Sequence, residues 1–261
     1  MLASGVAALH ALFWTLLKSG DRVIYPNVSY MAVYRMFHEL FNRKFGVETV
    51  MVDMTDLSAV KKAITPGTRL VHIETPDNPT NGVTDIEAIA KIAHENGAVL
   101  SVDNTFASPY NQKPLELGAD FVVEALTKFI NGHGDAQGGA IISNDLETMD
   151  RIRYEAQVNV GSVISPFNAW KMKNGYGGVI SFGVNAGDKA VEKFCATLKV
   201  VTFAVSLGHD ESLIFPQPSY DERIHLYPEK FRKGFIRFSV GLEDPDDIIA
   251  DLDQALRSIG L

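Results

Sequence analysis

The sequence predicts a layered α/β fold, because short apolar strand segments alternate with amphipathic helix segments along most of the chain. Loops rich in Pro, Asn and Gly stand where several of these strands end. A hydrophobic content of 46% with 21% charged residues is that of an ordinary globular protein. In parallel α/β sheets ligands bind at the carboxyl ends of the strands, so the functional residues are expected in the loops that follow them.

Composition excludes several classes of partner. The chain has 24 basic and 32 acidic residues and no basic stripe, which argues against nucleic acid and anionic membrane surfaces. Its single cysteine, Cys195, makes neither an internal disulfide nor a multi-cysteine metal site, and fits a reducing cytoplasm. No apolar stretch approaches the roughly 18 residues of a membrane span.

The first predicted helix follows Ser4-Gly5-Val6 and ends at Ser19-Gly20-Asp21. Amides exposed at such a helix start suit an anion such as phosphate, and a plain N-cap at Ser4 is the alternative. The sequence begins almost directly on this helix. We therefore expect that a preceding segment is missing.

Strand and helix candidates then alternate. In order they are strand Arg22 to Tyr25, helix Tyr30 to Phe45, strand Glu48 to Val52, a helix from Asp56, strand Arg69 to Glu74, helix Asp85 to His94, strand Val99 to Val102, and a buried strand from Phe121 to Leu126. Tyr30 stands at a loop-to-helix junction, where its ring either packs or points into a cleft.

Residues that could bind a ligand or take part in catalysis follow three of these strands. The loop Glu74 to Gly82 presents Asn78. Asp103 follows the next strand, where its carboxylate can bind a metal, cap a loop or pair with a ligand cation. Lys128 leaves the strand after that one, and is either snorkelling to water or held partly desolvated as a nucleophile. Adjacent strand ends share one edge, so Asp103 and Lys128 are expected to face one cleft.

A set of short motifs in this order resembles the Cys/Met-metabolism family of pyridoxal 5'-phosphate (PLP) enzymes. The motifs are Ser4-Gly5, Tyr30, Glu74-x-Pro-x-Asn78-Pro79, Asp103-Asn-Thr-Phe106, Thr127-Lys128 with Asn131-Gly-His-Gly-Asp135, Ala204 to Gly208, Glu211 to Ile214, and Arg237 to Asp244. The resemblance implies a PLP-dependent transferase fold of type I, with a mostly parallel sheet, helices on both of its faces and a smaller C-terminal α/β domain.

The resemblance implies PLP as cofactor and assigns residues to it. Lys128 would bind the cofactor aldehyde, and Asp103 would pair with the protonated pyridine nitrogen. The other cofactor residues that it implies are Gly5, Val6 and Thr127 at the phosphate, Asn78 at the phenolic oxygen, Thr105, and Tyr30 stacked on the ring.

For the substrate, the resemblance implies a sulfur amino acid whose α-carboxylate is held by Arg237, in the predicted strand Phe235 to Val240, with Ser206 beside it. On residue type alone Arg237 is equally an ordinary surface arginine. Lys128 would move protons and Tyr30 would act as an acid to the leaving sulfur. The implied reaction is γ-elimination of the methionine γ-lyase type, giving a thiol, ammonia and a 2-oxo acid.

Three alternatives stay open. Two are enzymes, namely cystathionine γ-lyase and a γ-replacement enzyme such as cystathionine γ-synthase or an O-acylhomoserine sulfhydrylase. The third is a non-catalytic relative that keeps the fold as a scaffold, suggested by Ala125 where the family usually has serine. Met31-Ala32 also replaces the usual Gly-Gly or Gly-Cys, so the cysteine associated with methionine γ-lyases is absent.

The resemblance further implies a large PLP-binding domain over residues 1–172, a small domain over 173–261, and a homotetramer of dimers that share active sites. Compared with the family, an N-terminal arm and a segment linking the domains are expected to be missing, and the stretch Lys230 to Phe235 is shortened. We expect these segments to belong to a longer chain.

Other polar features receive structural interpretations. His133 and Asp135 lack a further histidine or cysteine partner, so no metal site is expected there. Cys195 has the spacing of a core residue in a helix. The acidic cluster Glu243 to Asp247 is expected to cap a helix, and nucleotide-binding glycine motifs are absent from the sequence.

Overall fold

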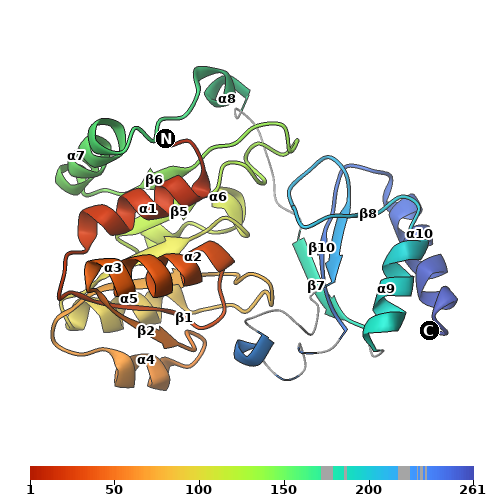
Figure 1. The fold of residues 1–261 in the computed structure, drawn as a ribbon, viewed down its shortest axis with the longest axis horizontal. Helices are drawn as coiled ribbons and strands as arrows, with labels where there is room; N and C mark the ends of the chain where they lie inside the picture. The colour runs from red at the N-terminus through yellow and green to blue at the C-terminus, as the bar shows by residue number, and fades with distance from the viewer. Residues whose placement is uncertain (172–178, 185–186, 217–223, 228, 230–231, 233) are drawn as a thin grey trace.

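The computed structural model describes the chain except for residues 172–178, 185–186, 217–223, 228, 230–231 and 233 (Figure 1). Within the described residues there is a six-stranded sheet of order β2-β1-β3-β4-β5-β6 and a four-stranded sheet of order β7-β10-β9-β8. The predicted domain boundary at residue 172 falls in an undescribed stretch, and it stays a prediction.

The larger sheet is parallel except at one edge. Its strands are β1 (Arg22–Pro26), β2 (Glu48–Val52), β3 (Thr68–Glu74), β4 (Val99–Asp103), β5 (Phe121–Glu124) and β6 (Ala140–Ile142). Strands β1 to β5 run parallel to their neighbours, and β6 pairs with β5 in the antiparallel direction. The carboxyl ends of the parallel strands therefore share one edge of the sheet.

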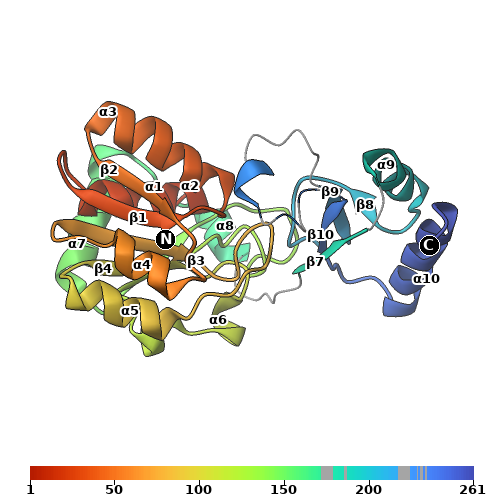
Figure 2. The ribbon, with the colours of Figure 1, turned by 90° about the horizontal axis from the view of Figure 1, so that it is seen from below.

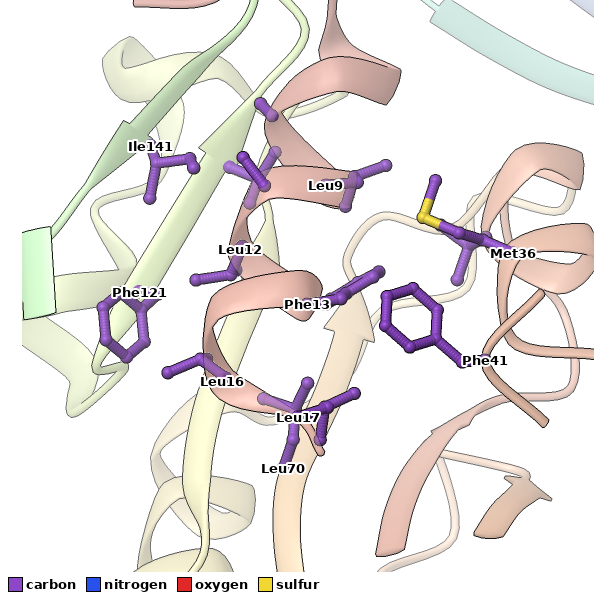
Figure 3. Close-up of a cluster of buried hydrophobic side chains, with 14 of the residues drawn as sticks. Leu9, Leu12, Phe13, Leu16, Leu17, Met36, Phe41, Leu70, Phe121 and Ile141 are labelled. Carbon is purple, nitrogen blue, oxygen red and sulfur yellow. The ribbon is translucent and has the colours of Figure 1, made fainter. Parts of the chain in front are cut away.

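One face of this sheet is covered by α1 (Gly5–Leu16) and α7 (Leu146–Tyr154), together with a helical segment after Tyr30. Ser4 caps α1 through its hydroxyl, which accepts the Ala7 amide at 3.1 Å. Figure 3 shows Leu12 and Phe13 of α1 wedged between Phe121 of the sheet and Phe41 of the helical segment. This apolar cluster packs α1 against the sheet.

The opposite face is covered by α4 (Leu57–Ala63) and α5 (Ile86–Glu95). Their caps are the predicted residues, because the carboxylates of Asp56 and Asp85 accept backbone amides at the two helix starts. Val60 and Ile89 are fully buried in the second core cluster, against strands β3 and β4. Helices therefore cover both faces of the sheet, as the sequence predicts.

The single α-helix predicted over Tyr30 to Phe45 is wrong in detail. The segment consists of α2 (Met31–Arg35), a π-helix (Met36–Asn42) and α3 (Arg43–Phe45). The wider π turn adds a residue to the local repeat, and both Phe37 and Phe41 reach the core through it. Apolar spacing cannot separate this arrangement from a continuous α-helix.

The smaller sheet consists of β7 (Val179–Gly183), β8 (Thr202–Phe203), β9 (Leu213–Pro216) and β10 (Phe235–Ser239). Helices α9 (Asp188–Thr197) and α10 (Pro245–Ser258) cover its side turned away from the larger sheet, as the view in Figure 2 shows. Ile236 and Phe238 of β10 pack in the core beneath these helices. The alternation of a strand turns Arg237, between them, toward the larger sheet.

The remaining described elements are short. They are α6 (Ser108–Asn111), α8 (Pro166–Lys171), a π-helix (Glu155–Asn159) and two 3-10 helices (Pro114–Leu117 and Ile224–Leu226). Across the described ranges, none of the helices combines the length and the apolar character that a membrane crossing requires.

Candidate active site

A cavity of about 450 Å³ lies at the carboxyl edge of the larger sheet, where it meets the smaller sheet. Its lining comes from both sheets and from the start of α1. The lining residues are Ser4, Gly5, Val6, Leu9, Tyr30, Glu74, Asn78, Asp103, Thr105, Phe106, Ala125, Thr127, Lys128, Gln137, Val205, Leu207 and Arg237. All the predicted site residues except Ser206 are in this set, although their individual roles stay predictions.

Lys128 enters the cavity from the turn that follows β5. Its amide donates to the Ala125 carbonyl at 3.1 Å, and its own carbonyl accepts the Gly132 amide at 2.7 Å. Burial, and to a lesser extent the nearby Arg237, lower the pKa of Lys128 to about 8. The side chain is therefore a desolvated amine rather than a snorkelling cation, with a larger neutral and nucleophilic fraction near neutral pH.

The turn that carries Lys128 is held by a loop of the smaller sheet. Gly208, at a φ of +73°, is so close that a Cβ there would lie 2.9 Å from the Lys128 backbone. Only glycine combines that approach with a positive φ at low cost. The loop after β8 therefore fixes the position of the lysine.

Asp103, at the end of β4, supplies a buried carboxylate to the same cavity. Its Oδ1 accepts the Thr105 hydroxyl at 2.6 Å and the Thr105 amide at 3.0 Å. The Thr105 hydroxyl in turn accepts the Ala125 amide at 2.8 Å. Burial raises the pKa of Asp103, and the bonds from Thr105 partly offset this rise. Thr105 thus orients the carboxylate, which can hold a ligand cation.

The start of α1 forms the third wall. A Cβ at Gly5 would lie 2.6 Å from the Ala125 side chain, so the helix start touches the segment after β5. The first turn carries no acidic residue, and its free amides and helix dipole favour an anion. Thr127 adds a hydroxyl that already exchanges hydrogen bonds with the backbone of Gly138, at 3.1 and 3.2 Å.

Tyr30 and Asn78 are both held by Glu74, a residue that the sequence analysis did not assign to the site. Glu74 Oε2 accepts the Tyr30 amide at 2.7 Å, and Oε1 accepts the Asn78 amide at 2.8 Å. Burial, followed by the charges of Asp103 and Glu74, raises the pKa of the Tyr30 phenol. The phenol therefore stays protonated and is suited to act as an acid.

Arg237 closes the cavity from the smaller sheet. Its Nη1 donates to Asn78 Oδ1 at 3.3 Å, and its Nη2 donates to the carbonyls of Val205 and Ser206. Burial lowers the pKa of the guanidinium to about 10, so it remains charged at neutral pH. A buried, planar cation of this kind suits a carboxylate ligand.

Ser206 lies beside Arg237, as predicted, but its hydroxyl is turned elsewhere. The Oγ lies 2.9 Å from Nε2 of His209, and only the Ser206 carbonyl contacts the guanidinium, at 3.1 Å. Ser206 is not among the residues that line the cavity. Direct contact between its hydroxyl and a substrate stays a prediction.

The residues that fit PLP are thus gathered in one place. A phosphate suits the helix start at Gly5, a pyridinium suits Asp103, and an aldehyde suits the amine of Lys128. The close approach of Gly5 to Ala125, which a Cβ would prevent, brings the helix start against the segment that leads to Lys128, and these residues line one cavity.

The polar residues that were expected to have structural roles, namely His133, Asp135, Cys195 and the acidic cluster Glu243 to Asp247, do not line this cavity. Within the part of the chain that the structure describes, no group of His, Cys, Asp and Glu side chains is arranged to hold a metal ion. Cys195 lies on α9, and burial raises the pKa of its thiol to about 11. Asp244 caps α10 by accepting the Asp246 amide at 2.9 Å, as predicted for the acidic cluster.

Comparison with protein families gives one family for nearly the whole chain. The family described as Cys/Met metabolism PLP-dependent enzyme matches residues 1–176 and 171–257. The match consists of two pieces that overlap at residues 171–176.

Individual relatives cover almost all of the chain. Canavanine gamma-lyases from Pseudomonas canavaninivorans and Rhizobium leguminosarum bv. trifolii are 39% and 40% identical, with 98% of this chain and 78% and 77% of those proteins covered. An L-methionine gamma-lyase from Pseudomonas putida is 35% identical, with 98% and 78% covered. The crystal structure of metB from Corynebacterium glutamicum has a TM-score of 0.89 at 32% identity and covers 99% of this chain and 80% of that one.

Proposed function

This chain belongs to the Cys/Met metabolism family of PLP-dependent enzymes, and we propose that it catalyses γ-elimination from an α-amino acid. The family contains carbon–sulfur lyases and γ-synthases, and the fold is theirs. One observation carries the proposal. A single cavity holds an amine with a lowered pKa, a buried carboxylate, a buried guanidinium and a protonated phenol.

The cofactor residues in this proposal are those of the cavity wall. Gly5, Val6 and Thr127 would hold the phosphate, Asp103, oriented by Thr105, would pair with the pyridine nitrogen, and Asn78 would bind the phenolic oxygen. When bound, PLP withdraws electrons from the bonds at the substrate α-carbon. Proton transfer and substrate binding are assigned to side chains of the protein.

Lys128 moves the protons. Its lowered pKa, about 8, leaves a fraction of the amine neutral near neutral pH, and in that form it can accept a proton from the α-carbon. Once it has passed that proton on, the neutral amine can accept a second one from the β-carbon. The Gly208 contact keeps the lysine backbone in place during these transfers. A lysine with an ordinary pKa would be almost entirely protonated at neutral pH.

Tyr30 serves the leaving group. Its phenol is held protonated by burial and by two nearby carboxylates, so it can donate a proton to the departing γ-atom. With 41% of its surface exposed, the ring remains reachable by a substrate.

Arg237 holds the α-carboxylate at the other end of the substrate. Its three hydrogen bonds to Asn78, Val205 and Ser206 fix the guanidinium plane before a substrate arrives. The N–H groups that these three bonds leave free can donate to a carboxylate, which orients the α-carbon toward Lys128.

The comparisons and the sequence motifs support two classes of substrate. Canavanine is the first, because over the aligned residues the canavanine gamma-lyases are 39% and 40% identical to this chain and the methionine gamma-lyase is 35% identical. Met31-Ala32 also lacks the cysteine associated with methionine γ-lyases. A sulfur amino acid such as methionine or cystathionine is the second class, as the sequence motifs predict. Both place a leaving group on the γ-carbon.

Product analysis of the PLP-loaded protein tests the proposal. We expect release of hydroxyguanidine from L-canavanine, or of a thiol from L-methionine or L-cystathionine, without any added thiol. The Lys128→Ala variant is the control for cofactor-independent release. Turnover of O-acetyl-L-homoserine only in the presence of an added thiol would instead identify a γ-replacement enzyme, and no turnover of any of the four would reject the proposal.

We also propose that the chain forms a homotetramer of dimers that share active sites. Tyr30 and Val6 are 41% and 38% exposed beside a further hollow that also contains His10 and Arg35, an opening that a second copy can cover. Light scattering of the full-length protein should give four times the chain mass. A stable, active monomer would contradict this arrangement.

A further inference from the structure

We propose that Glu74 is a positioning residue that sets the distance between the two ends of the substrate, by holding Tyr30 directly and Arg237 through Asn78. This inference rests on the proposed function, because it takes Tyr30 as the acid and Arg237 as the carboxylate site. Glu74 itself does not act on the reacting atoms.

The geometry is a continuous chain of hydrogen bonds across the cavity. Glu74 Oε2 accepts the Tyr30 amide at 2.7 Å, and Oε1 accepts the Asn78 amide at 2.8 Å. Asn78 Oδ1 then accepts Nη1 of Arg237 at 3.3 Å. One carboxylate thus ties the loop after β1 to the loop after β3, and the second loop contacts β10 of the smaller sheet.

The surroundings of Glu74 make a purely structural role costly. The side chain is only 6% exposed, and the register of β3 and β4 places it directly beside Asp103. Burial, followed by the charge of Asp103, raises the pKa of Glu74 well above its ordinary value, so an acidic side chain is costly to keep in this place. A side chain without an ionisable group would pack here without that cost. What a carboxylate alone provides is two acceptor oxygens for two amides.

The helix that follows Tyr30 holds its carbonyl, which accepts the Val33 amide at 2.9 Å, but does not hold its amide. Tyr30 precedes α2 as the N-cap residue, and its side chain makes no capping hydrogen bond. The first amides of a helix otherwise turn to water. With its amide bound to Glu74, the Tyr30 backbone is anchored to the sheet edge and its ring can face the cavity.

Glu124 offers a matched control. It is 2% exposed, lies at the end of β5 and accepts the Asn104 side-chain amide at 2.7 Å. Its carboxylate is as buried as that of Glu74 and is near the same Asp103, yet it does not line the cavity. The two glutamates therefore differ in what they position and not in burial.

The test compares Glu74→Gln with Glu124→Gln in the PLP-loaded protein. A glutamine keeps the shape but turns an NH2 group toward one of the two amides. We expect E74Q to lower kcat and to raise KM together, by about 10- to 100-fold in kcat/KM, the scale of a small misplacement in an active site. E124Q is expected to stay within about threefold of the wild type.

Two further readouts separate positioning from lost stability. E74Q should shift the pH at which the absorbance band of the bound cofactor changes, because Asn78 moves, and E124Q should not. In combination with Tyr30→Phe, E74Q should add little to the fall in kcat, because both act on the same group. Glu74→Asp, which keeps the carboxyl group and shortens the side chain, is expected to show the same joint change in kcat and KM.

The inference is overturned if E74Q and E74D match E124Q in kcat, KM and the absorbance titration. Multiplicative effects of E74Q and Tyr30→Phe on kcat would overturn it as well. A failure of the proposed function is distinguishable, because the wild type itself would then release no product from the amino acids tested.

Discussion

Replacing Arg237 with lysine is the most informative single perturbation of the substrate site. The variant keeps one positive charge but loses the planar fork, so it cannot keep the bonds to Asn78, Val205 and Ser206 while also offering two donors to a carboxylate. We therefore expect a defect in binding geometry rather than in net charge.

The size of the effect follows from the bonds lost. A hydrogen bond to a charged group contributes about 1.5–3 kcal/mol, and about 1.4 kcal/mol corresponds to a tenfold change. Loss of one of two bonds to the α-carboxylate should lower kcat/KM by roughly 10- to 150-fold. Initial rates of leaving-group release against substrate concentration measure this directly.

Arg232→Lys is the matched control. Arg232 belongs to the same C-terminal region and donates from Nε to the Tyr227 carbonyl at 2.8 Å, but it lines a different cavity. Its replacement should leave kcat/KM within about threefold of the wild type. The reasoning about Arg237 fails if R237K and R232K are indistinguishable and both remain folded by thermal unfolding.

Three further predictions concern the lysine, a buried acid and a glycine. Because the pKa of Lys128 is lowered to about 8, the rate of PLP incorporation into cofactor-free protein, followed by absorbance, should rise with pH and level off above about pH 8; a rise that continues to the ordinary lysine value of 10.5 would contradict this. Burial raises the pKa of Glu124 from 4.5 to about 8, so the folded state loses stability as the pH rises through that window. In Glu124→Gln this loss should be absent. Between pH 4.5 and pH 8 the free energy of unfolding of the variant, measured in urea, should therefore rise relative to that of the wild type by on the order of 4 kcal/mol. Equal pH profiles for the two proteins would refute the assignment. Gly208→Ala should lower the free energy of unfolding by about 1–3 kcal/mol and weaken PLP binding, because the new Cβ would meet the Lys128 backbone. The control is Gly20→Ala, at a φ of +88° in open space, which should leave PLP binding unchanged.

Much of the fold could be predicted because strand and helix periodicities are local properties of the sequence. The strand Glu48–Val52 has the predicted bounds, and β1, β3 and β4 differ from their predicted ranges by one residue each. Chain order then places Asp103 and Lys128 at one sheet edge, since parallel neighbours end on the same side. That grouping needed no knowledge of side-chain contacts.

The parts that could not be predicted depend on contacts between distant segments. Glu74 and Tyr30 are 44 positions apart, and Asn78 and Arg237 are 159 apart, so no local pattern reports these bonds. The direction of the Ser206 hydroxyl is likewise decided by His209 in a loop without regular structure. Glu74 did carry one signal, its place at a strand end beside Asp103, which a register argument could have used.

The central claim is that Lys128 is the residue to which PLP attaches, and reduction of the PLP-loaded protein with borohydride followed by peptide mass spectrometry tests it most directly. The account predicts a pyridoxyl group on the peptide that contains Lys128, and its absence from that peptide in Lys128→Ala. A modification carried mainly by another lysine, or none at all under conditions that give amino-acid turnover, would contradict the account.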